Sequence, residues 1–197
     1  MRLGRVTVTG GFVLVWGIMV YLDAGRIAAL CLLTALLHEA GHLLFLLLCG
    51  GRLRSAELNA SGAVIRTQPG QLSYKREIAC VLAGPAASLA AALLFALGGD
   101  RINFAFAPAR DGLAGLCLLQ GAFNLLPARG LDGGRALRLM LEHRQSPRTE
   151  TVVRWATLIA VWAAAAFTAA AFALGGYSPA ALMIGALAVL SMIGTED

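Results

Sequence analysis

The sequence predicts an all-α membrane protein, a bundle of about six transmembrane helices with a short β-hairpin on its cytoplasmic side. Of its 197 residues, 58% are hydrophobic and only 14% are charged, and the mean hydropathy is +0.74. Soluble domains carry roughly 25% charged residues. The apolar residues form long uncharged runs, and a helix that crosses the hydrocarbon needs about 20 of them, because lipid offers no partner for backbone polar groups. A water-soluble fold is therefore not expected.

Six runs approach this length, and together they are interpreted as a single domain over residues 1–197. They lie at about residues 6–22, 27–50, 78–99, 112–128, 155–174 and 180–195. The last two come from one long uncharged run that a cluster of Gly, Tyr, Ser and Pro at 175–179 divides by a turn. The first run follows two arginines as a secretory signal does, but no small-residue cleavage site follows it, so we expect a retained helix.

The basic residues predict the orientation of the bundle. Thirteen of the 16 Lys and Arg residues fall on one side of the membrane when the N-terminus is placed in the cytoplasm. Because Lys and Arg favour cytoplasmic loops, both termini are expected there. The net charge of +5 is explained in this way, and nucleic acid is not an expected partner. Arg144, Arg148 and Arg154 either meet acidic lipid head groups or a partner, or remain solvated.

Residues 52–67 differ in kind from the apolar runs around them. Charges are scattered along this segment, and β-branched Val64 and Ile65 follow a turn-like Asn-Ala-Ser-Gly stretch at 59–62. This pattern predicts a short hairpin that lies against the cytoplasmic side of the bundle.

The second apolar run contains the sequence His38-Glu39-Ala40-Gly41-His42. On a helix the two histidines lie one turn apart on the same face, so both can bind one Zn²⁺ at about 2.0–2.1 Å. Glu39 lies beside them and can act on water, which is the arrangement of a zinc peptidase. The alternatives are a chance match or a role in helix packing. Ionisable residues in the middle of a span cost on the order of 3 kcal/mol each, which favours a functional site.

A catalytic zinc usually takes three protein ligands. The four cysteines lack CxxC spacing and are interpreted as small buried side chains, not as thiolate ligands or disulfides. His143 is expected to be a solvated side chain in a hydrophilic loop. Asp132 lies in a segment rich in helix breakers, Pro127, Gly130, Gly133 and Gly134. Non-helical backbone at membrane depth is tolerated only where it is buried in protein or lines a cavity, so Asp132 can turn toward the histidines as a ligand. The alternative is that Asp132 pairs with Arg129 or Arg135.

These residues resemble the site-2 protease family of intramembrane metalloproteases, peptidase family M50, and within it the small six-helix branch typified by stage IV sporulation protein FB. The resemblance rests on the histidine motif at 38–42, on Ala-Gly-Pro at 83–85, and on the Asn-Leu-Leu-Pro to Leu-Asp-Gly-Gly-Arg segment at 124–135. It differs from the family pattern at Ser88, near a place where asparagine is common, and at Gly130, where proline is common. We expect neither residue to contact the proposed ligands.

The resemblance implies that His38, His42 and Asp132 bind one Zn²⁺ per chain, that Glu39 is the catalytic base, and that Asn124 holds the substrate backbone. For Asn124 an interhelical hydrogen bond is the alternative. The implied reaction is the hydrolysis of peptide bonds in a membrane-associated protein, in regulated proteolysis of a signalling or transcription-factor precursor, as in sporulation.

The expected setting is a multi-pass protein in the bacterial cytoplasmic membrane. Its expected partners are the bilayer, a protein substrate, which the hairpin can hold by strand addition, and a membrane inhibitor or regulator. Two other classes of function remain. A membrane metal-ion transporter can use the same His, Glu and Asp residues as a transport site, and an inert scaffold would leave these residues without a role.

Overall fold

The structure is a computed structural model that describes residues 2–3, 6–23, 26–59, 62–67, 72–98, 107–175, 189 and 192. Most of these residues are helical. The helices are α1 (Gly10–Asp23), α2 (Arg26–Leu48), α3 (Tyr74–Leu97), α4 (Ala107–Asn124), α5 (Asp132–His143) and α6 (Thr149–Gly175). The strands are β1 (Arg2–Leu3), β2 (Val6–Val8), β3 (Leu53–Asn59) and β4 (Gly62–Thr67).

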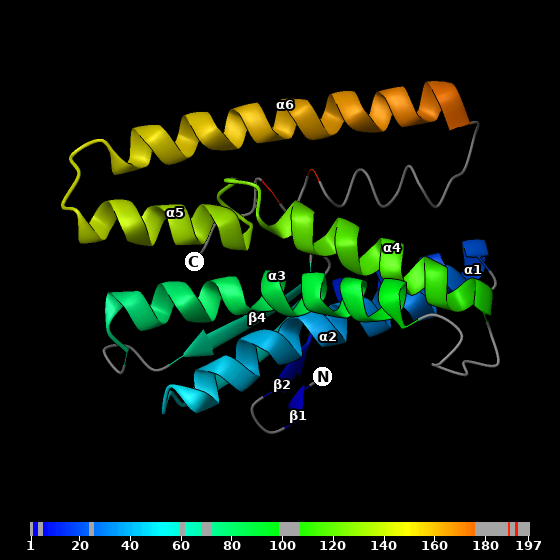
Figure 1. Cartoon of the computed structure of the whole chain (residues 1–197), viewed down its shortest axis with the longest axis horizontal. Helices are drawn as coiled ribbons and strands as arrows, with labels where there is room; N and C mark the ends of the chain where they lie inside the picture. The colour runs from blue at the N-terminus through cyan, green and yellow to red at the C-terminus, as the bar shows by residue number, and fades with distance from the viewer. Residues whose placement is uncertain are drawn as a thin grey trace.

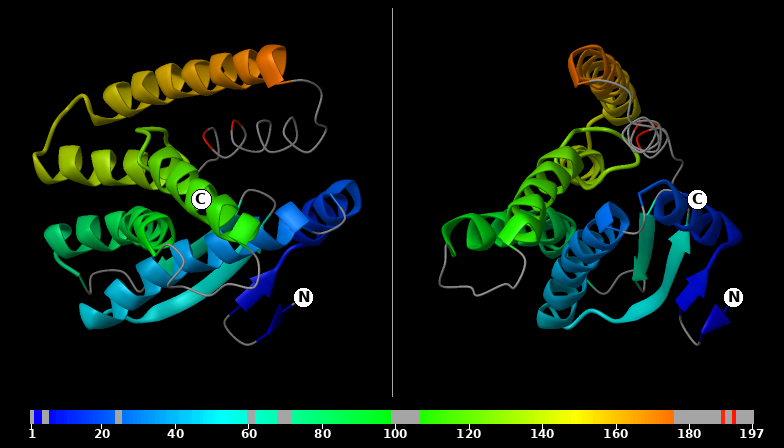
Figure 2. Two further views of the ribbon diagram at one scale, coloured as in Figure 1. Left: turned by 45° about the vertical axis from the view of Figure 1, so that its right-hand side comes forward. Right: turned by 90° about the vertical axis from the view of Figure 1, so that its right-hand side faces the viewer.

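Helix α3 lies at the centre of the molecule, where it contacts α2, α4 and α5. Helix α6 packs against α5, and α1 packs against α2. Figure 1 shows α6 along one edge of the molecule and the strands near the opposite edge. Figure 2 shows the same separation from two further directions. The helices that matter for the site below, α2, α3 and α5, therefore lie between α6 and the sheet.

The sheet has four strands in the order β1-β2-β3-β4. The hairpin predicted at 52–67 is present as the antiparallel pair β3 and β4, with Glu57 opposite Val64. Strand β2 extends this hairpin into a larger sheet, because it pairs in parallel with β3, with Val6 opposite Ala56. The prediction that 6–22 forms one helix is wrong at its start. Two of the three residues of β2 are β-branched valines, which favour a strand, and α1 begins only at Gly10.

The segment between α4 and α6 also differs from the prediction. Helix α4 ends at Asn124, before the predicted end of its span, and the residues up to His143 form helix α5, so that the expected hydrophilic loop begins only with the turn at Arg144 and Gln145. Gly133 and Gly134 do not break this helix. A Cβ on Gly134 would meet the carbonyl oxygen of Ala128, and a Cβ on Gly133 would meet that of Leu125. These glycines instead allow the preceding loop to fold tightly against the start of α5.

Two further boundaries concern the end of the chain. Helix α6 begins at Thr149, six residues before the predicted span at 155–174. The predicted span at 180–195 lies outside the described residues, except for residues 189 and 192. Met192 is buried in an apolar cluster with Ala128, Leu131 and Ala160. This cluster joins the loop before α5 to α6.

Three of the described helices are long and apolar enough to cross a membrane. The apolar stretches are Ala28–Leu48, Tyr74–Leu97 and Thr149–Ala170, and Gly112–Asn124 is a shorter apolar helix. Only 12–28% of the residues in the three most apolar windows are buried. Large apolar side chains such as Leu97 and Trp162 are 76% and 74% exposed. Such extensive exposed apolar surface marks a contact with a membrane or with another protein.

Gly41 sets how closely α2 and α3 approach. A Cβ at this position would lie 2.5 Å from Cβ of Ala87 and 2.7 Å from the carbonyl oxygen of Ala83. We expect Gly41→Ala to destabilise the protein by about 1–3 kcal/mol, the usual cost of overpacking. Thermal unfolding in detergent measures this change.

Gly115 on α4 is the matched control, because nothing lies within 4 Å of a Cβ built there. Since alanine is the better helix former, Gly115→Ala should leave the melting temperature unchanged or raise it. Equal melting temperatures for the two variants would contradict the close approach at Gly41.

Candidate metal centre

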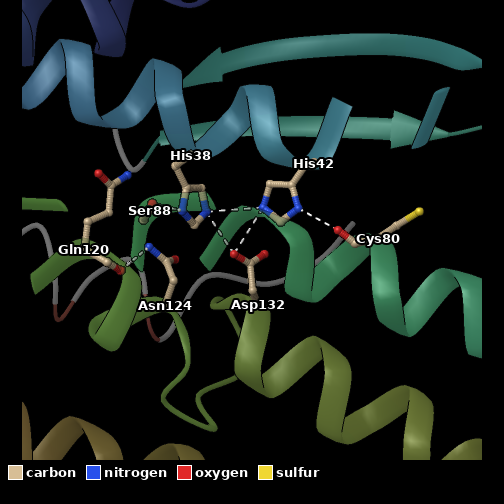
Figure 3. Close-up of polar contacts among 7 residues, drawn as sticks. All are labelled: His38, His42, Cys80, Ser88, Gln120, Asn124 and Asp132. Atoms are coloured by element: carbon tan, nitrogen blue, oxygen red, sulfur yellow. Dashed lines mark hydrogen bonds and ion pairs between the residues drawn. The ribbon is translucent and has the colours of Figure 1, made fainter. Parts of the chain in front are cut away.

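Three side chains from two helices meet in the centre of the molecule. His38 and His42 lie one turn apart on α2, and Asp132 is the first residue of α5 (Figure 3). Oδ2 of Asp132 lies 3.0 Å from Nε2 of His38 and 3.2 Å from Nε2 of His42, and the two Nε2 atoms are 3.2 Å apart. The three residues thus form a group that can hold a metal ion.

The donor atoms of this group fit zinc. Two imidazole nitrogens and one carboxylate oxygen are a common catalytic zinc set, and ligands of a tetrahedral zinc lie about 3.3 Å apart. Nδ1 of His42 lies 2.9 Å from the backbone carbonyl of Cys80, which can only accept a hydrogen bond, so this nitrogen donates. Nε2 of His42 then offers a lone pair toward the carboxylate of Asp132, and two such acceptors at 3.2 Å need a cation or a proton between them.

The ionisation of Asp132 suits this arrangement. Its Oδ2 lies within 3.2 Å of both Nε2 atoms, so a cation or a proton held between these atoms favours the charged carboxylate. The carboxylate also lies in the first turn of α5, where the helix dipole favours negative charge. Asp132 is therefore available as an anionic ligand.

The second ring nitrogen of each histidine has its own partner. His42 uses the carbonyl of Cys80, and Nδ1 of His38 lies 3.0 Å from the hydroxyl oxygen of Ser88, which is fully buried. Such outer partners fix the orientation and the tautomer of a metal-binding histidine. The prediction that Ser88 does not contact the proposed ligands is wrong. The signal that could have found it is a lone hydroxyl in an otherwise apolar stretch of α3, one turn after Gly84.

The glycine of the Ala-Gly-Pro motif makes room for a ligand. A Cβ on Gly84 would meet the imidazole ring of His42, including its Nε2. Gly84 itself is buried in α3. Any larger residue at this position would therefore displace the ring from Asp132.

Asp132 is held in place by neighbours that were not identified from the sequence. The predicted alternative, an ion pair with Arg129 or Arg135, does not form: Arg129 pairs with Glu150 at 2.7 Å, and Arg135 lies 3.8 Å from Glu77. The loop before Asp132 is instead fixed to α6 by its backbone.

The side chain of Thr157 makes this backbone contact. The backbone N–H of Arg129 donates to Oγ1 of Thr157 at 2.9 Å, and that hydroxyl donates to the carbonyl of Val153 at 2.7 Å. The hydroxyl is thus oriented by its own helix. Because Arg129 precedes Asp132 by three residues, α6 helps to position the third ligand.

Glu39 lies next to the metal group along α2. It is partly buried, and its carboxylate interacts electrostatically with His42, His38 and Asp132. A carboxylate at this place can exchange a proton with a molecule that occupies the metal site.

Asn124 and His143 have different positions relative to the metal group. Asn124 is the last residue of α4, its Nδ2 donates to the backbone carbonyl of Gln120 at 3.0 Å, and Figure 3 shows it beside the metal group.

His143 is exposed at the other end of α5, where its ring lies 5.1 Å from that of Tyr74. His143 does not join the metal group, in agreement with its interpretation as a solvated side chain. All four cysteines are free, and none belongs to the group.

Comparison with known proteins agrees with this geometry. No protein-family model matches the chain. The chain is 36% identical over 132 residues to "Putative zinc metalloprotease Rip3" of Mycobacterium tuberculosis, in strains Erdman and H37Rv. The match covers 64% of this chain and 34% of the relative, so the chain spans about a third of the length of these curated relatives.

A solved structure matches over the whole chain. The site-2 protease from Methanocaldococcus jannaschii superimposes with a TM-score of 0.66 and 20% sequence identity, covering 100% of this chain and 95% of that protein. The fold is that of a site-2 protease.

The contact between Ser88 and His38 can be tested by metal binding. Ser88→Ala removes the hydroxyl, and loss of such an outer partner typically lowers metal affinity about 10–100-fold. Zinc affinity is measured by competition with a chromophoric chelator. Ser73→Ala, at the N-cap position just before α3, is the control, because the Ser73 side chain makes no capping hydrogen bond. An unchanged zinc affinity in Ser88→Ala would remove the proposed contribution of this contact.

Proposed function

We propose that the chain is an intramembrane zinc metalloprotease of the site-2 protease family, which hydrolyses peptide bonds of membrane-associated proteins. The observation that carries the proposal is the convergence of His38, His42 and Asp132 within a bundle whose helices are apolar enough to cross a bilayer. The similarity to a named zinc metalloprotease and to the fold of a site-2 protease supports the same activity.

His38, His42 and Asp132 would hold one zinc ion per chain. Zinc supplies a Lewis acid that acidifies water and polarises a carbonyl group. The chain's own contribution is to orient the ligands. Ser88 and the carbonyl of Cys80 hold the rings from one side, and the loop anchored on α6 brings in the carboxylate from the other.

Glu39 acts as the general base. It takes a proton from the attacking water as the C–O bond forms, and it gives this proton to the nitrogen of the leaving amine as the C–N bond breaks. Asn124 contacts the substrate. One N–H of its amide is used within α4, which leaves a second N–H and the carbonyl oxygen to pair with the backbone of an extended peptide.

The membrane is the setting of the reaction. We place both termini in the cytoplasm, as the distribution of Lys and Arg predicts, and we place the exposed apolar surfaces of α2, α3 and α6 in contact with lipid or with a substrate helix. Membership of the six-helix branch typified by stage IV sporulation protein FB, regulated proteolysis of a signalling or transcription-factor precursor, and control by a membrane inhibitor remain predictions of the resemblance.

The decisive variant is Glu39→Gln, which removes the base and keeps the size of the side chain. We expect zinc to remain bound and cleavage of membrane-associated candidate substrates to fall about 10²–10⁴-fold, the usual contribution of a general base. Purified protein in detergent is assayed for both cleavage and zinc content. Glu142→Gln, an exposed substitution on α5, is the matched control.

This experiment also separates the protease from a metal-ion transporter. A transporter has no need of a base, so it would move metal across vesicles in both the wild type and Glu39→Gln. Cleavage that persists without Glu39 would contradict its role as the base, and metal flux in both proteins without any cleavage would favour the transporter.

The edge of the sheet offers a place for the substrate. A peptide helix hides its carbonyl groups in its own hydrogen bonds, so the substrate has to unwind before hydrolysis. Among the described strands, β4 pairs with β3 alone, so β4 forms one edge of the sheet. An extended peptide can add to such an edge.

Replacing Gly62–Thr67 by alternating Gly and Ser should weaken this edge. We expect kcat/KM to fall about tenfold, the equivalent of one or two backbone hydrogen bonds, with zinc content unchanged. The same replacement in Arg2–Leu3, at the other edge, is the control. Unchanged cleavage after the β4 replacement would exclude strand addition there.

A further inference from the structure

A hollow in the described part of the chain lies apart from the metal group. It has a volume of about 670 Å³ and opens between the loop before α5 and the first turns of α6. Its lining combines two cations, one carboxylate, a hydroxyl, an indole and one apolar side chain, from Arg129, Arg154, Glu150, Thr151, Trp155 and Leu158. None of these side chains contributes to the metal group described above.

The charges in this hollow leave an excess of one positive charge. Glu150 pairs with Arg129 at 2.7 Å and also with Arg138 at 3.1 Å, so its single negative charge is shared between two cations. Arg154 is exposed and makes no ion pair within the part of the chain that the structure describes. An anion of charge −1, with oxygens that accept from guanidinium groups, complements this set.

The position of the hollow along α6 indicates what carries that anion. Arg154 is the last charged residue of the helix, and residues 155–175 contain none. Beyond it, Trp155, Leu158 and Trp162 follow at the spacing of one helical stripe, and all three are substantially exposed. Figure 2 shows α6 at the edge of the bundle. Arginine and tryptophan at the end of an apolar helix mark the level of lipid head groups.

The geometry points to a site for an anionic phospholipid at the N-terminal end of α6. Arg154 and Arg129 hold the phosphate, Trp155 lies at the level of the head group, and one acyl chain follows Leu158 and Trp162. This inference rests on the membrane location in the proposed function, and it does not depend on the protease activity.

Such a lipid also acts close to the metal group. A phosphate on Arg129 competes with Glu150 for the same guanidinium, and the backbone of Arg129 is tied to α6 through Thr157. Arg129 is thus shared between the lipid site and the loop that carries Asp132.

Quenching of tryptophan fluorescence tests the site in the full-length chain in detergent micelles. Phosphatidylglycerol with brominated acyl chains should quench saturably through Trp155 and Trp162, and brominated phosphatidylcholine should need about fivefold higher concentration. Arg154→Gln should weaken the binding of phosphatidylglycerol about fivefold, as expected for one arginine at a membrane surface. Glu150→Gln should strengthen binding, because it frees Arg129.

Arg148→Gln is the matched control, since it makes the same change in charge at an exposed position outside the hollow. Its affinity should stay within about twofold of the wild type. Equal losses in Arg148→Gln and Arg154→Gln would overturn the site in favour of diffuse surface charge. Equal quenching by phosphatidylcholine, or displacement of the lipid by millimolar inorganic phosphate, would overturn it as well. None of these readouts involves zinc or cleavage, so a failure here is distinct from a failure of the proposed protease.

Discussion

The close approach of α2 to α3 determines where most of the polar groups in this molecule lie. Two glycines permit it, one on each helix: Gly41 meets the backbone of α3, and Gly84 gives space to the ring of His42. At this separation the two histidines reach the Ser88 hydroxyl and the Cys80 carbonyl. A buried imidazole without such partners would be costly. The packing of two apolar helices thus supplies the hydrogen bonds that orient both rings toward one point.

The third ligand depends on a different part of the structure. Asp132 reaches the histidines because the loop at 125–131 folds back tightly on the first turn of α5. The backbone of this loop lies so close to Gly133 and Gly134 that no side chain would fit at either position. The same loop is fixed to α6 through Thr157. The metal group therefore joins two structural units, the pair α2 and α3 on one side and the loop with α6 on the other. A change in either unit alters the distance between the carboxylate and the rings.

Much of this arrangement could be predicted from the sequence, for reasons that are local. The spacing of His38 and His42 determines that both rings lie on one face of a helix, and the uncharged runs identify the apolar helices. The contacts that depend on distant segments could not be predicted. Ser88 is 50 residues from the histidine that it contacts, and Thr157 lies beyond the loop that it holds. No local pattern records these pairings.

The errors have physical causes as well. Val6, Thr7 and Val8 lie at the start of an apolar run that predicts a helix, but pairing with β3 decides their conformation. The polar residues around His143 predict a loop, and Gly133 and Gly134 usually interrupt helices, but helix α5 spans both places. In the structure the close contact with the preceding loop requires residues without side chains there. In both places tertiary contacts outweigh the local preference of the chain.

The parallel pairing of β2 with β3 restricts how the chain can be threaded through a bilayer. Strand β2 precedes α1 and β3 follows α2, so their hydrogen bonds keep the beginning and the end of this helical pair on one face. The two helices then cross together or not at all, an even number of passages. Helix α1 has 14 residues and is about 21 Å long, shorter than the ~30 Å hydrocarbon core. A crossing by this pair therefore implies hydrophobic mismatch, with the lipid drawn thinner around the N-terminal helix than around its longer neighbours.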